Sequence, residues 1–186
     1  MKINIAIAGG PCTGKSTLAA YLFATLKTKG YDYDLIAEEN RKLKKEFGDY
    51  RSPFERFYMW RQQEREELRS AAADGFVTDT PLFHLYVSAR MYAKEDRDKL
   101  AVRELFRMCL ETDDRYQVIV MATSPVEIPY HADQCRNAGL ETAIYRHGLI
   151  RSFVEHFWTE KLCFVEGSLE ERVKHVEDHL ERMRKV

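Results

Sequence analysis

The residues best suited to chemistry lie near the N-terminus, where positions 9–17 read Gly-Gly-Pro-Cys-Thr-Gly-Lys-Ser-Thr. Their spacing fits the pattern G-x-x-x-x-G-K-[ST] at every fixed position. The two pattern glycines permit backbone conformations that let successive amide N–H groups point inward and bind phosphate oxygens. Lysine can then bridge the β- and γ-phosphates, and serine can ligate Mg²⁺. The stretch predicts a nucleotide-binding loop made of Gly10, Pro11, Cys12, Thr13, Gly14, Lys15, Ser16 and Thr17.

The flanking residues predict the two elements that such a loop needs. Residues 3–8 alternate and are rich in Ile, which is typical of a strand. Residues 15–29 carry Leu18, Leu22 and Leu26 at helical spacing, and Gly30 follows as a C-cap. The positive end of this helix would add to the attraction for phosphate. Cys12 stands at a variable position, so we expect it to fill space rather than to act as a nucleophile.

The composition is that of an ordinary globular domain. The chain has 186 residues, of which 45% are hydrophobic and 32% charged, with a net charge of −1. This near-neutral charge gives no overall electrostatic case for binding nucleic acid. The four cysteines are widely spaced, which argues against a zinc site and favours a reducing, cytoplasmic setting. We expect neither a signal peptide nor a membrane span.

The rest of the chain alternates between strand-like and helix-like stretches. Strands are predicted at 3–8, 33–37, 76–78, 116–122 and 162–165. Helices are predicted at 15–29, 41–47, 54–73, 82–92, 97–111, 141–158 and 169–183, with Gly75 ending the third. This alternation predicts an α/β fold, a doubly wound five-stranded parallel sheet with helices on both faces. We interpret residues 1–186 as one domain that carries a flap at about 123–140.

The strands' carboxyl ends carry the informative polar residues. Ligands bind beyond these ends in a doubly wound sheet. Asp79 follows the third strand and could hold Mg²⁺ or its water, or could instead cap the next helix. Glu38 or Glu39 follows the second strand and could accept a proton from an acceptor hydroxyl, or could simply form a solvated helix turn. Arg136 lies in the flap, where it could cover the transferred phosphate or remain a surface arginine.

The predicted helix at 54–73 could form the floor of an acceptor site. Phe57 and Trp60 could stack on a base, and Gln63 could hydrogen-bond it, although aromatic residues at helical spacing are also typical of a core. Arg41 belongs to a basic cluster at 41–45, which could be a solvated face. The same cluster could contact an acceptor phosphate or a nucleic-acid backbone.

Several of these motifs together resemble the small P-loop kinases grouped with the ribosylnicotinamide kinase domain of NadR type. The resemblance rests on the complete phosphate loop, Glu38-Glu39-Asn40-Arg41, Asp79-Thr80 and a Pro-aromatic-x-x-Asp-x-x-Arg segment at 129–136. It implies a kinase that uses ATP and Mg²⁺, with adenine held near Gly167 and the following Glu171-Arg172. Gln134 stands where the family usually has Gly, so nicotinamide riboside is not implied as the acceptor.

Three functions follow as hypotheses. The first is an ATP-dependent kinase that phosphorylates a hydroxyl of a nucleoside- or nucleotide-like acceptor. The alternative is a phage-type kinase that acts on a hydroxymethylated pyrimidine in DNA, with nucleic acid as the acceptor. The third is a nucleotide-binding switch, although a GTPase would need an N-K-x-D motif that the chain lacks. An AAA+ motor is not expected, because the chain leaves no room for a helical lid domain. The oligomeric state, monomer or homodimer, stays open.

Overall fold

The computed structural model describes residues 1–37, 52–125 and 139–185, and these build one parallel sheet between helices. The strands are β1 (Ile5–Ala8), β2 (Tyr33–Ile36), β3 (Gly75–Thr78), β4 (Val118–Met121) and β5 (Leu162–Phe164). Their order is β2-β3-β1-β4-β5, with every neighbouring pair parallel. The predicted α/β class, the five strands and their parallel arrangement are confirmed.

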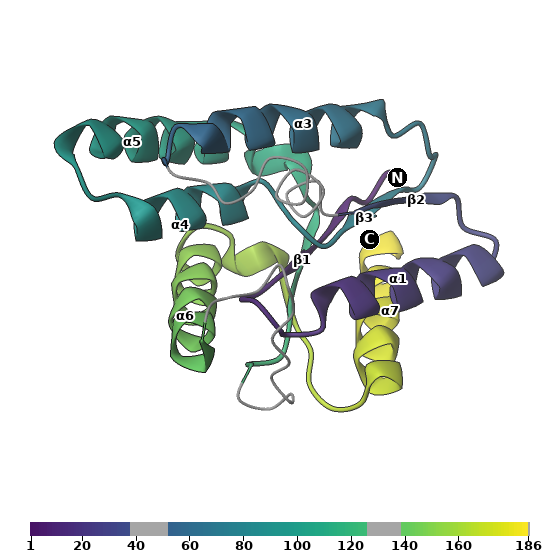
Figure 1. The fold of residues 1–186 in the computed structure, drawn as a ribbon. Coiled ribbons are helices and arrows are strands. Elements are labelled where there is room, and N and C mark those ends of the chain that lie inside the picture. Colours follow the sequence, from purple (N-terminus) through teal and green to yellow (C-terminus); the bar gives the residue numbers. More distant parts are fainter. Residues whose placement is uncertain (38–51, 126–138, 186) are drawn as a thin grey trace.

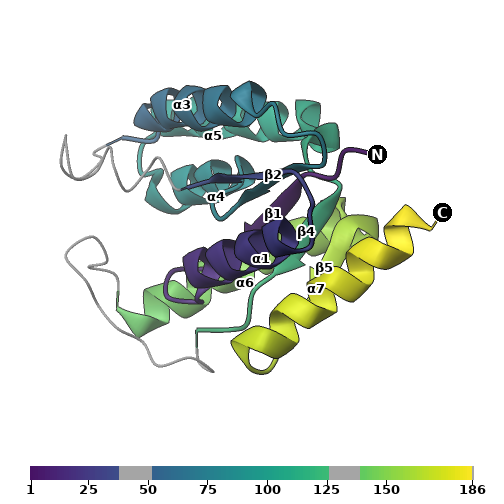
Figure 2. The same cartoon turned by 90° about the vertical axis from the view of Figure 1, so that its right-hand side faces the viewer.

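The helices cover the sheet on both faces (Figures 1 and 2). One face carries α1 (Lys15–Thr28) and α7 (Leu169–Arg184). The other face carries α3 (Glu55–Arg69), α4 (Phe83–Tyr92), α5 (Asp96–Glu111) and α6 (Leu140–Phe157). Two 3₁₀ turns, 113–115 and 159–161, precede β4 and β5.

Alternation along the strands divides the interior into two cores. In β1, Ile5 and Ile7 belong to the core under α1 and α7, while Ala6 and Ala8 belong to the core under the other helices. The second core is rich in aromatic side chains, including Trp60, Phe76, Phe83, Phe153 and Trp158. All four β1 residues are fully buried, which explains why the strand has no polar face.

The central position of β1 fixes where the phosphate loop lies. Ile5 pairs with Val77 of β3 on one side and with Val118 of β4 on the other. After β1 the chain crosses to β2 and returns through β3, and only then passes to β4. The loop at the end of β1 therefore lies where the order of the strands reverses, which is where doubly wound sheets bind ligands.

Two predicted boundaries at the third helix are wrong. The helix was expected to run from 54 to 73, but α3 ends at Arg69. Gly75 does not end the helix; it begins β3 with a φ of 128°. A Cβ atom at Gly75 would lie 2.3 Å from the carbonyl oxygen of Ile3, so glycine is needed there by both conformation and space. The helix expected at 41–47 and most of the flap lie outside the described residues.

Candidate active site

The phosphate loop leaves β1 in a series of positive-φ turns. Gly9 has a φ of 149°, Cys12 of 59° and Gly14 of 71°, and α1 begins directly afterwards at Lys15. Cys12 is the one non-glycine residue with positive φ among the described residues. A left-handed conformation costs such a residue on the order of 1–3 kcal/mol, and that kind of strain gathers at ligand sites. The loop has the backbone conformation that the motif predicts.

Lys15 folds back across this loop. Its Nζ lies 2.5 Å from the carbonyl oxygen of Gly10 and 3.5 Å from Oγ1 of Thr13. The Thr13 hydroxyl in turn donates to the same Gly10 oxygen at 2.9 Å. Ser16 and Thr17 are exposed in the first turn of α1, while Pro11 is half-buried. A cation thus lies over the loop, with two hydroxyls open to solvent beside it.

Two histidines contact the start of the loop from helices on the same face of the sheet. The backbone N–H of Gly9 donates to Nε2 of His84 in α4 at 3.3 Å. The backbone N–H of Gly10 donates to Nδ1 of His147 in α6, also at 3.3 Å. Both histidines are buried, and the sequence did not mark either of them as a site residue. The described loop is therefore attached to α4 and α6 as well as to β1 and α1.

The electrostatics of this region favour neutral histidines. Burial lowers the pKa of His84 well below its ordinary value, and Lys15, Arg146 and His147 lower it further. Burial also lowers the pKa of His147 to about 4, with added repulsion from Lys15 and Arg151. Each cause disfavours the charged imidazolium. At neutral pH both rings can therefore accept a hydrogen bond from the loop.

Asp79 lies beside the loop, one strand away. It follows Thr78, which pairs with Ala6 of β1, and it is only 5% exposed. It does not cap α4: the helix has Leu82 at its N-cap with no side-chain cap, and the Leu82 N–H donates to the Tyr116 hydroxyl at 2.9 Å. The alternative in which Asp79 serves as a helix cap is therefore wrong.

The residues present fit a magnesium ion bound together with nucleotide phosphates. Among the described residues, no group of three or more His, Cys, Asp or Glu side chains could hold a metal alone. Mg²⁺ in phosphoryl-transfer sites usually takes phosphate oxygens and waters with only one or two protein ligands. An exposed Ser16 hydroxyl and the Asp79 carboxylate supply a donor set of that kind.

Gly167 lies in the turn between β5 and α7, at the same edge of the sheet. It has a φ of 87°, and its carbonyl oxygen accepts from Nε of Arg172 at 2.7 Å. A capping box follows: Oγ of Ser168 accepts from the Glu171 N–H, and the Glu171 carboxylate accepts from the Ser168 N–H at 2.7 Å. The structure thus holds this turn rigidly near the end of β5.

Of the three predicted acceptor residues of α3, Trp60 and Gln63 are buried and Phe57 is partly buried. Trp60 is 0% exposed and Gln63 2% exposed, and Phe57 packs against the same core. The amide of Gln63 donates to Oγ1 of Thr78 at 3.2 Å, directly before Asp79. The structure therefore places Trp60 in the core rather than on a surface where a base could stack. Aromatic residues have the same helical spacing whether they pack in a core or line a base-binding surface, so the sequence alone does not separate the two.

Four predicted site residues, Glu38, Glu39, Arg41 and Arg136, lie outside the described residues. The described chain reaches Ala37, one residue after the end of β2. Arg136 belongs to the segment between β4 and α6. Their roles stay predictions.

A buried polar network behind Thr78 was not foreseen from the sequence. The Tyr116 hydroxyl donates to Oε1 of Glu67 at 2.9 Å, and Gln63 donates to the same oxygen at 3.3 Å. Arg115 lies 4.0 Å from the other Glu67 oxygen. Burial raises the pKa of Glu67 to about 7, against the lowering effects of its hydrogen bonds and of Arg115. This carboxyl group therefore titrates near neutral pH.

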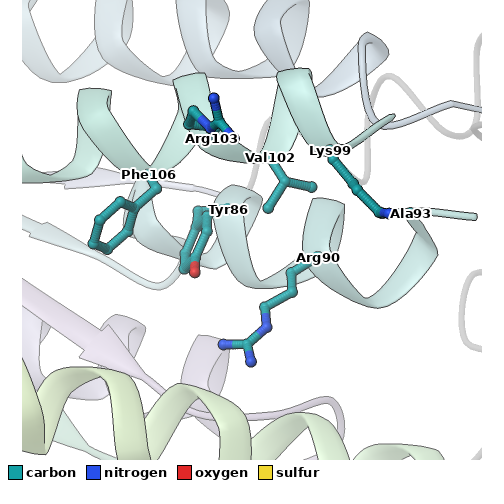
Figure 3. Close-up of a pocket in the computed structure, with 7 residues that line it drawn as sticks. All are labelled: Tyr86, Arg90, Ala93, Lys99, Val102, Arg103 and Phe106. Carbon is teal, nitrogen blue, oxygen red and sulfur yellow. The ribbon is translucent and has the colours of Figure 1, made fainter. Parts of the chain in front are cut away.

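A separate hollow of about 300 Å³ lies between α4 and α5 (Figure 3). Its floor includes the rings of Tyr86 and Phe106, whose centroids are 5.4 Å apart. Arg90, Lys99 and Arg103 stand around it. No residue of the phosphate loop and none of the predicted site residues lines this hollow.

The comparison with protein families agrees with the loop and the fold. The AAA_28 family, described as an AAA domain, matches residues 4–172. The chain belongs to this family. The AAA_28 match covers β1, the phosphate loop and the sheet through to the first turn of α7. The family description, an AAA domain, does not by itself separate a kinase from a motor. No curated protein matches the chain.

Three solved structures illustrate the fold that this chain shares. A NadR protein in complex with NR has a TM-score of 0.71 at 18% identity, over 95% of this chain and 51% of that one. A NadR protein with NAD and AMP-PNP has a TM-score of 0.72 at 21% identity, over 100% and 50%. Deoxyadenosine kinase from M. mycoides has a TM-score of 0.66 at 11% identity, over 97% and 100%. The chain spans about half the length of the NadR structures.

The described helices also answer the question of membrane insertion. None of the helices in residues 1–37, 52–125 and 139–185 is both long and apolar enough to cross a membrane.

Proposed function

We propose that this protein is an ATP- and Mg²⁺-dependent kinase that transfers the γ-phosphoryl group to a hydroxyl of a nucleoside- or nucleotide-like acceptor. One observation carries the proposal. The loop has left-handed turns at Cys12 and Gly14 and carries the Lys15 ammonium, and it follows the central strand of a parallel sheet whose neighbouring strand β3 leads to Asp79. The solved structures of similar fold, which include a NadR protein and a deoxyadenosine kinase, support the same proposal.

In this proposal the chain's own groups position the phosphates. Loop amides and the N-terminus of α1 bind the β-phosphate, and Lys15 leaves the Gly10 carbonyl to contact the β- and γ-phosphates. Ser16 and Asp79 would hold a magnesium ion, which would supply positive charge next to the phosphate oxygens. Phosphoryl transfer needs little covalent help, so positioning and electrostatic stabilisation supply most of the rate. Gly167 would border the adenine.

The acceptor side is proposed around the end of β2 and the buried face of α3. Glu38 or Glu39 would orient the acceptor hydroxyl, while Arg41 and Arg136 would contact acceptor and phosphate. On α3, Nε1 of Trp60 and Oε1 of Gln63 are buried, and within the described structure neither has a hydrogen-bond partner. Such atoms are costly to leave unpaired. Because both residues are buried, the residue of α3 that we propose beside the base is the partly exposed Phe57, with Trp60 and Gln63 behind it.

Acceptor-dependent turnover is the test of this function. The measurement is ADP formation from ATP and Mg²⁺, with and without a panel of nucleosides and mononucleotides. We expect turnover that requires both an acceptor and Mg²⁺. Asp79→Asn should raise the Mg²⁺ concentration needed for half-maximal rate, whereas the exposed Asp114→Asn should not. Turnover that is the same without any acceptor would instead favour a nucleotide-binding switch, and no turnover or ATP binding would remove the proposal altogether.

A further inference from the structure

The first two amides of the phosphate loop point away from the phosphate side and into the protein. The Gly9 N–H is bonded to Nε2 of His84, and the Gly10 N–H to Nδ1 of His147. Both hydrogen bonds are buried. A buried N–H group without an acceptor is destabilising, so these two histidine nitrogens satisfy N–H groups that β1 and the loop leave unpaired.

Each histidine must be neutral and in one tautomer to do this. Nε2 of His84 accepts, so its proton is on Nδ1; Nδ1 of His147 accepts, so its proton is on Nε2. The charged groups that face these rings are cations: Lys15 for both, Arg146 for His84 and Arg151 for His147. A positive surrounding disfavours a second proton, which keeps both nitrogens available as acceptors.

The packing at Gly10 shows how closely α6 approaches the loop. A Cβ atom at Gly10 would lie 2.7 Å from the carbonyl oxygen of Ala143 and 2.8 Å from Cβ of His147. Glycine at this position therefore lets the helix backbone meet the loop directly. On the other side, His84 is the second residue of α4, the helix that follows Asp79. The two rings thus connect the loop to α4, which follows Asp79, and to α6, which follows residues 126–138.

We propose that His84 and His147 are positioning residues of the phosphate loop, which hold Gly9 and Gly10 in the conformation that binds nucleotide phosphates. Without an acceptor, each N–H group would find another partner by moving the loop. Nucleotide binding would then have to restore the original conformation, and the cost of that change would appear as weaker affinity for ATP. This inference rests on the proposed function, because it assumes that the loop binds ATP.

The test replaces each histidine once with a residue that keeps an acceptor atom and once with a residue that lacks one. Glutamine places its amide oxygen as many bonds from Cβ as Nε2, and asparagine does the same for Nδ1. His84→Gln and His147→Asn should therefore keep ATP affinity near that of the wild type. His84→Leu and His147→Leu fill similar space without an acceptor, and each should weaken ATP binding about tenfold. The exposed His175 of α7 provides the control His175→Leu.

A second measurement does not depend on ATP. Amide hydrogen exchange of the ligand-free protein, followed by NMR, reports the two hydrogen bonds themselves. His84→Leu should accelerate exchange at Gly9 and His147→Leu at Gly10, while the glutamine and asparagine variants should stay protected. The inference is overturned if the leucine variants leave these two amides protected, or if they bind ATP as the wild type does. If the wild type binds no ATP, the proposed function fails, and exchange alone decides the role of the histidines.

Discussion

At the scale of single residues, Lys15 connects the structure most directly to chemistry. Its ammonium group rests on the Gly10 carbonyl, at a point that nucleotide phosphates would occupy. Lys15→Ala should lower the rate of phosphoryl transfer about a thousandfold or more, since one such charge stabilises the transition state by several kcal/mol. The measurement is kcat with saturating ATP and acceptor. Lys27→Ala, on the exposed part of the same helix, is the control. Near-normal turnover in a folded Lys15→Ala variant would contradict the assignment.

Glu67 gives a prediction on stability rather than on catalysis. It is almost fully buried, and its pKa of about 7 lies above the ordinary value of 4.5. A carboxyl group whose pKa is higher in the folded state than in the unfolded state destabilises the protein when it is ionised. Its contribution to stability is therefore full below pH 4.5 and is lost as the pH rises toward 7. At neutral pH and above, the ionised Glu67 carboxylate should therefore lower the free energy of unfolding.

Glu67→Gln removes this titration while keeping a similar shape. At pH 8 the variant should be more stable than the wild type, by up to about 3 kcal/mol, because burial raises the pKa of Glu67 from 4.5 to about 7. Between pH 4 and 5 the advantage should vanish. The measurement is the free energy of urea unfolding across this pH range, with the exposed Glu66→Gln as control. A difference that does not change with pH would show that Glu67 does not titrate as argued.

At the scale of elements, the sequence predicts best where the signals are local. The first strand, the loop and the α7 capping box each depend on residues within a few positions of one another. The end of α3 was missed because Ala71–Ala73 favour a helix locally. In the structure, the Ala73 N–H donates to the Asp32 carboxylate at 2.8 Å, and the Asp74 N–H donates to the Asp32 carbonyl at 2.9 Å. These contacts with the start of β2 override helix propensity.

The candidate site also contains residues that a local sequence signal predicts and residues that only distant contacts place there. The loop and Asp79 could be found from a motif and from the end of a strand. His84 and His147 could not, since they lie 75 and 137 residues from the glycines that they contact. The available signal for His84 was its place in the first turn of the helix that follows β3 at the ligand edge. Trp60 was misplaced because an aromatic residue at helical spacing looks alike in a core and beside a base.

The α7 capping box permits a prediction at this scale. Ser168 and Glu171 satisfy each other's backbone N–H groups, and α7 packs on α1 through the core that lies behind the loop. Ser168→Ala should destabilise the protein by about 1 kcal/mol, which lowers Tm by roughly 2–4 °C for a chain of this size. Ser168→Asp, which keeps an acceptor, should stay within a few tenths of a kcal/mol. The measurement is thermal unfolding by calorimetry; equal effects of the two substitutions would exclude capping as the cause.

At the scale of the whole molecule, the even charge balance bears on the size of the acceptor. The chain carries 29 Lys and Arg against 30 Asp and Glu, so no general field draws it to nucleic acid. The local exception is the basic run at 41–45, which lies outside the described residues between β2 and α3. A free acceptor and a base within DNA would use this run differently. Only the DNA acceptor would need it to neutralise several phosphates.

Salt dependence therefore separates the two acceptors. For a free nucleoside, kcat/KM should change little between 50 and 200 mM salt. Four cations on duplex phosphates would instead lower DNA affinity about a hundredfold over the same range, because each contact adds roughly 0.9 to the logarithmic slope. We expect the first outcome, with Lys44→Glu leaving nucleoside turnover nearly unchanged. The assay compares nucleosides with duplexes containing a hydroxymethylated pyrimidine, both titrated with salt. Turnover confined to the duplex, with a steep salt slope that Lys44→Glu weakens, would assign the acceptor to DNA and overturn the free-nucleoside proposal.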